Sequence, residues 1–214
     1  KNFPSEEANI PSSIDEKLRS YQKDGVKWLH VLARHNLSGI LADDMGLGKT
    51  LEMIALLSTS KEEKPILVVT PKSLIYNWER EFHQWDSSVD VTVLDGDKES
   101  RNSIYSSINQ DKKDVYVISY ESLRNDLDQL VPYTFSYVIL DEAQSISNVF
   151  AKKTKAVKKI QADHKFVLTG TPIQNSYMDL WSIFDFLMPG YLPSYHDFQK
   201  IYLANTEDEE MQAK

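Results

Sequence analysis

The chain carries the stretch Asp43-Asp44-Met45-Gly46-Leu47-Gly48-Lys49-Thr50. It follows a short apolar run, residues 39–42, and precedes a helical apolar pattern in residues 51–57. A strand, a glycine loop, Lys-Thr and a helix form the arrangement that grips a nucleoside triphosphate through backbone N–H groups and the helix N-terminus. Lys49 can reach the β- and γ-phosphates, and the Thr50 hydroxyl can ligate Mg²⁺. The strict pattern has glycine at position 43, so the loop predicts nucleotide binding through an imperfect match.

The composition is typical of a globular domain. Its 214 residues suffice for one α/β domain with a sizeable core, and 41% of them are hydrophobic and 26% charged. No apolar run approaches the ~20 residues of a membrane span, and residues 1–7 lack the apolar core of a signal peptide. The absence of cysteine excludes disulfides and thiolate zinc sites, and it fits an intracellular protein.

The charge is unevenly distributed along the chain. A net charge of −8 argues mildly against a large non-specific nucleic-acid surface. Much of the excess is local, at residues 207–210 and near the N-terminus, whereas residues 152–159 are rich in lysine. The net charge therefore does not decide the partner, and a solvated helix face is the simpler interpretation of the lysines.

Short apolar segments alternate with helical patterns along the rest of the chain. The predicted strands after the glycine loop are residues 65–70, 91–94, 115–118, 137–140 and 165–168. Strands separated by helices imply right-handed crossovers. The sequence therefore predicts an α/β fold with a mostly parallel sheet and helices on both faces.

Two helices carry the clearest periodic patterns. The one before the first strand is predicted to bury one face, made of Leu18, Tyr21, Gly25, Trp28 and Leu32. The one after Pro71 carries a longer apolar set, made of Leu74, Ile75, Trp78, Phe82 and Trp85. Its aromatic side chains fit packing against the sheet better than a platform for stacked bases.

An acidic motif strengthens the nucleotide hypothesis. The apolar strand at residues 137–140 runs directly into Asp141-Glu142-Ala143-Gln144. In a parallel sheet this places both carboxylates at the carboxyl edge, where the glycine loop also lies. Asp141 can hold Mg²⁺ through water, and Glu142 can orient and deprotonate the water that attacks the γ-phosphate. Alone, an Asp-Glu pair after a strand is more often a solvated loop; the upstream Lys-Thr loop reverses that balance.

A third element follows the last predicted strand. Residues 168–175 read Leu-Thr-Gly-Thr-Pro-Ile-Gln-Asn. Hydroxyls and a glycine turn at a strand end can sense the phosphate state of a nucleotide. Taken in isolation, an ordinary Gly-Thr-Pro turn is the better interpretation.

Several motifs in order resemble the Swi/Snf family of helicase-like ATPases, which belong to superfamily two and translocate on double-stranded DNA. The resemblance covers residues 17–188 and rests on Leu-Arg-Ser-Tyr-Gln at 18–22, the glycine loop, Thr-Pro-Lys-Ser-Leu at 70–74, Asn-Trp at 77–78, Asp-Glu-Ala-Gln, and the motif at 168–175. It implies a RecA-like P-loop domain. Within this family, aspartate at position 43 is the usual residue.

The resemblance implies a role for each matching residue. Nucleotide binding falls to Gln22, as the adenine-recognising residue, and to Asp44, Met45, Gly46, Leu47, Gly48, Lys49 and Thr50. Lys49, Asp141 and Glu142 are the implied catalytic residues, with Thr50 and Asp141 on the metal. Coupling to movement of the lobes falls to Gln144, Thr169, Gly170 and Thr171. The DNA-binding positions are Pro71, Lys72, Ser73, Ser119 and Tyr120, and for Lys72 a solvated helix start is an equal alternative.

Three residues depart from the family pattern. Asp44 stands where glutamate is usual, Gln144 replaces histidine, and Ser147 replaces a common lysine, which removes one phosphate contact. The family also needs a second RecA-like lobe with an arginine finger, and nothing after Asn175 supplies it. Because such a finger is worth ~10³–10⁵ in rate, we expect this chain alone to hydrolyse ATP feebly.

The sequence thus predicts three regions: an irregular lead at 1–16, an ATP-binding lobe at 17–188, and a following helical element or tail at 189–214. With ATP, Mg²⁺, duplex DNA and a second lobe, the expected activity is DNA translocation that remodels protein–DNA complexes. DNA-bound proteins are possible further partners, no membrane is expected, and the location is intracellular, in nucleoid-associated cytoplasm or nucleus. The alternatives are a lobe of an Asp-Glu-Ala-His helicase acting on RNA or DNA, and a nucleotide-gated binding module.

Overall fold

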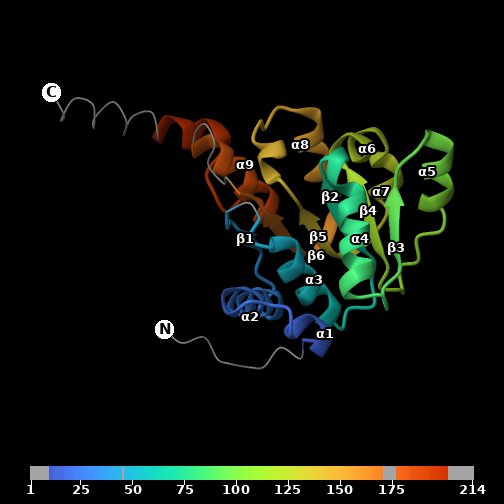
Figure 1. The fold of residues 1–214 in the computed structure, drawn as a ribbon. Coiled ribbons are helices and arrows are strands. Elements are labelled where there is room, and N and C mark those ends of the chain that lie inside the picture. Colours follow the sequence, from blue (N-terminus) through green and yellow to red (C-terminus); the bar gives the residue numbers. More distant parts are fainter. Residues whose placement is uncertain (1–9, 45, 171–176, 202–214) are drawn as a thin grey trace.

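The computed structural model describes residues 10–44, 46–170 and 177–201. Its centre is a six-stranded sheet in the order β1-β6-β5-β2-β4-β3, and every neighbouring pair is parallel (Figure 1). The strands are β1 (Gly39–Leu41), β2 (Ile66–Thr70), β3 (Val91–Leu94), β4 (Val115–Ser119), β5 (Thr134–Leu140) and β6 (Gln161–Leu168). The predicted α/β fold is confirmed.

The central strands are buried on both faces, which explains their unbroken apolar sequence. All five residues of β2 are buried, and its side chains alternate between two cores. Ile66 and Val68 enter one core, whereas Leu67 and Val69 enter the other. Helices must therefore cover both sides of the sheet.

The helices divide between these two cores. The first core receives α1 (Ser12–Asp15), α2 (Ser20–Arg34), α3 (Lys49–Thr59) and α4 (Ile75–Trp85), the last preceded by the 3₁₀ turn η1 (Lys72–Leu74). The second core lies under α5 (Lys98–Tyr105), α6 (Tyr120–Asn125), α7 (Leu127–Leu130), η2 (Ala143–Ile146), α8 (Lys152–Val157) and α9 (Tyr177–Leu187). Figure 1 shows this covered sheet, with α2 and α9 near one end and α5 at the other.

The buried face of α2 differs from the prediction. Val26, Leu29 and Ala33 form the buried line, whereas Tyr21 is 39% exposed. The predicted face is confirmed at Leu18, which is 6% exposed, and at Trp28 and Leu32, which pack against the first core, but not at Tyr21. Gly25 is the point where the side chain of Glu52 in α3 approaches closely: an added Cβ would lie 2.0 Å from Glu52 Oε2.

The two ends of the chain refine the predicted regions. The lead predicted as irregular contains α1, and its Ile14 is fully buried in the first core, so that part of the prediction was wrong. Beyond α9, residues 195–201 are helical. Each helix in the described ranges is too short or too polar to serve as a membrane span.

Candidate active site

The glycine loop joins β1 to α3. Gly46 and Gly48 both have φ of 84°, in the left-handed region that a side chain disfavours. A Cβ on Gly48 would also lie 2.3 Å from Gln22 Nε2, so a side chain there would displace the Gln22 amide from the loop. The loop therefore leads into the α3 N-terminus with an exposed backbone at Gly46, which is the geometry that an anion needs.

Lys49, the first residue of α3, folds back over this loop. Its Nζ donates to the carbonyl oxygens of Asp43 at 2.7 Å and Asp44 at 2.9 Å. Both partners are neutral, so a phosphate would offer the ammonium a stronger, charged acceptor. Thr50 follows in the first turn of α3 and is half-buried.

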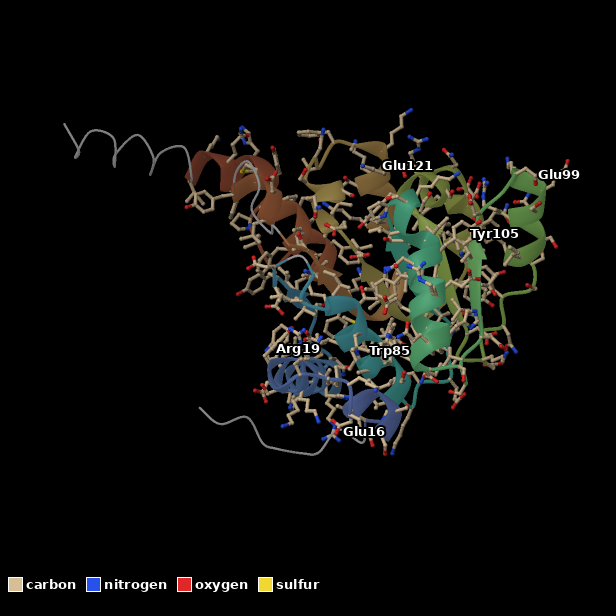
Figure 2. The ribbon with its side chains drawn as sticks, in the orientation of Figure 1. Glu16, Arg19, Trp85, Glu99, Tyr105 and Glu121 are labelled. Atoms are coloured by element: carbon tan, nitrogen blue, oxygen red, sulfur yellow. The ribbon has the colours of Figure 1, made fainter. Side chains whose placement is uncertain are left out.

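Gln22 lies against the same loop from the side of α2. Its Nε2 donates to the Leu47 carbonyl oxygen at 3.1 Å, and its Oε1 accepts from the Arg19 backbone N–H at 2.9 Å. The Tyr21 hydroxyl reaches the same carbonyl of Leu47 at 3.0 Å. Arg19 marks this end of α2 in Figure 2. The amide is next to the loop, and adenine recognition by Gln22 stays a prediction.

Asp141 follows β5 and is only 8% exposed. Its Oδ2 accepts hydrogen bonds from Trp78 Nε1 at 2.8 Å and Thr70 Oγ1 at 3.0 Å, and its Oδ1 accepts from the Glu142 N–H at 2.9 Å. Burial raises the pKa of Asp141, the bonds from Trp78 and Thr70 oppose that rise, and the charge of Glu142 adds to it. All three of these donors are neutral, so the carboxylate is buried with no cation beside it in the described part of the chain.

Glu142 has an unusual backbone conformation. Its φ of 49° and ψ of 56° place it in the left-handed region, a strained position that is often retained at functional sites. Its Oε2 accepts from Gln144 Nε2 at 2.6 Å, and Gln144 Oε1 accepts from Thr169 Oγ1 at 3.1 Å. The acidic pair is thus connected to the end of β6 through Gln144, and the coupling role of Gln144 and Thr169 stays a prediction.

Sheet register brings these groups to one edge. Leu41 pairs with Leu168, and Val167 pairs with Leu140, so β1, β6 and β5 end side by side. Thr169 therefore lies between the glycine loop and the acidic pair. Gly170 follows it and is half-buried, whereas Met45 and Thr171 lie outside the described residues.

The predicted DNA-binding residues fall into two groups. Lys72 and Ser73 are exposed beside half-buried Pro71, and Lys72 forms an ion pair with Asp95 at 3.3 Å. By contrast, Ser119 is 2% exposed and Tyr120 is 1% exposed. Direct contact of these two side chains with DNA is at odds with their burial: Ser119 caps α6, and the Tyr120 hydroxyl donates to the Asp141 carbonyl oxygen at 2.8 Å.

The model of the SNF2-related domain matches residues 21–214 of the chain. The chain belongs to the SNF2-related family. This confirms the resemblance drawn from the motifs. The TATA-binding protein-associated factor mot1 of Schizosaccharomyces pombe is 40% identical over 210 residues, which cover 91% of this chain and 11% of that protein.

Two further proteins are similar to this chain, one in sequence and one in both sequence and fold. An uncharacterized ATP-dependent helicase of Mycoplasma genitalium is 40% identical over 199 residues, 91% of this chain and 19% of that protein. The SWI2/SNF2 ATPase core of Sulfolobus solfataricus, solved in complex with double-stranded DNA, is 38% identical with a TM-score of 0.80. That match covers 92% of this chain and 41% of the solved one. The chain therefore spans under half the length of each of these relatives.

In this SNF2-related domain, the sequence reasoning missed Trp78 and Thr70 as partners of Asp141. Trp78 does pack against the sheet, at 1% exposure, as predicted. Its indole N–H nevertheless needs an acceptor once it is buried, and that need is the signal that was overlooked.

Glu52 is a second residue that the motifs did not indicate. It lies in α3 at 1% exposure, and its Oε1 has no hydrogen-bond partner among the described residues. Burial, followed by the charge of Asp43, raises the pKa of Glu52 to about 7, against the opposing charge of Lys49. A glutamate inside the otherwise apolar run of residues 51–57 was its only trace in the sequence.

No group of three or more acidic or histidine side chains in the described ranges is arranged to hold a metal ion. Mg²⁺ sites in nucleotide-binding proteins fit this pattern, since one or two protein oxygens act together with waters and substrate phosphates. The buried Asp141 carboxylate and the Thr50 hydroxyl are hard oxygen donors of the required kind. The residues present therefore fit a Mg²⁺ ion that arrives with a nucleotide.

Proposed function

We propose that this SNF2-related domain binds Mg·ATP and contributes the acidic half of an ATP hydrolysis site. The observation that carries the proposal is the burial of the Asp141 carboxylate among neutral donors. It lies at the edge of the sheet where the glycine loop begins after β1. A buried carboxylate without a cation is costly, and a metal ion removes that cost.

Each residue has one proposed task. Lys49 would exchange its two carbonyl partners for the β- and γ-phosphates, and Thr50 and Asp141 would hold Mg²⁺, Asp141 through water. When bound, Mg²⁺ would supply positive charge to the transferred phosphoryl group. Glu142 orients the attacking water and accepts its proton.

We further propose that turnover needs a second RecA-like lobe. The chain spans 41% of the solved ATPase core that it matches and 11% of the yeast relative, so activity of a whole protein is inferred from those relatives. Because an arginine finger from another lobe supplies ~10³–10⁵ in rate, residues 1–214 alone should turn ATP over weakly. Robust DNA-stimulated hydrolysis by residues 1–214 alone would contradict this.

The proposed work of the complete ATPase is movement along double-stranded DNA, which remodels protein–DNA complexes. Two findings support it: the solved core was captured with double-stranded DNA, and the similar mot1 is named as a factor associated with the TATA-binding protein. The exposed Lys72 and Ser73 are the side chains that we assign to the DNA backbone. Such a motor works where chromosomal DNA lies, in the nucleoid or the nucleus.

Replacement of Glu142 tests the proposal. Glu142→Gln in the full-length protein should lower ATP turnover by ~10²-fold or more and leave ATP binding intact, since the amide cannot accept a proton. Glu99→Gln is the control, because Glu99 is exposed on α5 at the far side of the domain (Figure 2). Normal turnover in Glu142→Gln removes that residue from the reaction.

The activating nucleic acid distinguishes the alternatives. ATP turnover of the wild-type protein is measured with duplex DNA and with single-stranded RNA at equal nucleotide concentration. Stimulation by duplex DNA is the expected result. Stimulation by RNA alone supports the helicase alternative instead.

A further inference from the structure

Asp141 is the point where three separate segments meet. Its backbone N–H donates to the Val69 carbonyl oxygen at 2.8 Å, and its own carbonyl oxygen accepts from Tyr120. Its Oδ2 accepts from both Trp78 and Thr70. The position of this carboxylate is therefore set by β2, α4 and α6 together.

The two bonds to Oδ2 determine which oxygen of the carboxylate remains available to a metal ion. A carboxylate oxygen offers two lone-pair sites, and Trp78 and Thr70 take both sites of Oδ2. Among the described residues, Oδ1 accepts one bond, from the Glu142 N–H, and keeps one site. Trp78 and Thr70 thus hold the carboxyl group by Oδ2 and leave Oδ1 as the oxygen that would serve a metal ion or its water.

The segment assigned to DNA adjoins both of these donors. Thr70 directly precedes Pro71, and Trp78 lies in the first turns of α4, which follows η1 without a break. On the surface, Asp95 accepts from the Tyr76 hydroxyl at 3.2 Å and pairs with Lys72 at 3.3 Å. A DNA phosphate at Lys72 competes with Asp95 and so acts on the start of the helix that carries Trp78.

The second segment reaches Asp141 from the opposite face of the sheet. Tyr120 opens α6, is 1% exposed, and donates its hydroxyl proton to the Asp141 carbonyl oxygen. Lys153 of α8 lies over its ring, 5.9 Å from the centroid. The burial of Tyr120, which is at odds with direct DNA contact, suits transmission of a displacement to Asp141.

We propose that Trp78 and Tyr120 are positioning residues that transmit duplex-DNA contact to the Asp141 carboxylate and so make ATP hydrolysis depend on DNA. The inference rests on the proposed function. Buried hydrogen bonds carry such a displacement because leaving one unmade is expensive. Contact of DNA with residues 71–73 shifts the start of α4. Because Trp78 and Tyr120 hold Asp141 between them, this shift moves the Asp141 carboxylate and brings Oδ1 to its metal-binding position.

Two conservative variants of the full-length protein test this inference. Trp78→Phe removes the indole N–H, and Tyr120→Phe removes only a hydroxyl, so each keeps the aromatic bulk. The measured quantity is the ratio of ATP turnover with saturating duplex DNA to turnover without it. We expect this ratio to fall about tenfold, within the usual range of coupling between two sites. The Mg²⁺ concentration for half-maximal turnover should rise, while duplex affinity, measured by fluorescence anisotropy, should not change.

Each variant has a matched control. Trp85→Phe removes a similar indole bond on the same helix, since Trp85 Nε1 donates to Glu81 Oε2 at 2.9 Å. Tyr105→Phe removes a buried tyrosine bond elsewhere, from the hydroxyl to Asp126 Oδ2 at 2.8 Å. Figure 2 labels both control residues: Trp85 is the last residue of α4, and Tyr105 is the last residue of α5. Both controls should keep the wild-type ratio and Mg²⁺ requirement.

The outcomes separate this inference from the proposed function. If the wild-type protein is not stimulated by duplex DNA, the proposed function fails and the inference fails with it. If the wild type is stimulated and both variants lose rate equally with and without DNA, at an unchanged Mg²⁺ requirement, only the inference is overturned. Thermal melting of every variant shows whether it folds. If Trp78→Phe does not fold, the result for Tyr120→Phe, which loses a single oxygen atom, decides whether the inference stands.

Discussion

Two buried aspartates in this domain have opposite electrostatic surroundings. Asp126 is 4% exposed and Asp141 is 8% exposed. Asp126 accepts from Arg101 through Nε and Nη2, and from the Tyr105 hydroxyl. Within the described part of the chain, Asp141 accepts only from neutral groups. Similar burial is therefore combined with a cation in one case and with none in the other.

The pKa directions follow from this difference. Burial alone would raise the pKa of Asp126, but the hydrogen bonds from Arg101 and Tyr105 and the charge of Arg101 outweigh it, so its pKa is lowered. Burial raises the pKa of Asp141, and no cation among the described residues opposes this rise. The chain thus supplies a cation to Asp126 itself, whereas under the proposed function the cation for Asp141 would come with the nucleotide.

The strongest test of this contrast is Asp141→Asn. The amide keeps an acceptor for Trp78 but loses the charge that holds the metal ion, so turnover should fall ~10³-fold. The free energy of unfolding without nucleotide should stay within about 1 kcal/mol of wild type or rise, because a buried charge has been removed. Steady-state ATPase assays and urea denaturation measure the two quantities. A large loss of stability would show that Asp141 is structural.

The matching change, Asp126→Asn, should give the reverse result. Arg101, whose side chain is 11% exposed, loses its anion, and the free energy of unfolding should fall by about 3 kcal/mol. ATP turnover per folded molecule should stay within about twofold of wild type, because Asp126 does not touch the candidate nucleotide site. A twofold change in rate corresponds to less than about 0.5 kcal/mol of activation free energy. A loss of turnover without a loss of stability would break the contrast.

The smallest expected effect is in the pH dependence of stability. The folded pKa of Asp126 lies below its ordinary value of 3.8, so its ion pair stabilises the fold above that pH and loses this effect as pH falls further. The stability difference between wild type and Asp126→Asn should therefore be constant from pH 7 to 5 and shrink below about pH 4. Urea denaturation of both proteins across this range measures it. A difference that grows on acidification would contradict the assignment.

Local patterns predicted most of the fold and brought the residues of the candidate site to one edge of the sheet. Strand positions, parallel connections, the glycine loop and the acidic pair all depend on short-range periodicity and turn chemistry. The errors concern facing and burial: the exposed Tyr21 on α2, the buried Ser119 and Tyr120, and the unremarked Glu52. A helix pattern with aromatic residues on several sides does not by itself fix which side meets the sheet.

By itself, the sequence determined which groups we assign to phosphate and metal, because glycine, lysine, threonine and carboxylates at strand ends have few other uses in that order. Only the tertiary structure decided how Asp141 is held. Its donors Tyr120, Trp78 and Thr70 lie 21, 63 and 71 residues away along the chain. The physical reason is that burial leaves each of these polar atoms in need of a partner, and the packing of β2, α4 and α6 around β5 determines which partner is within reach.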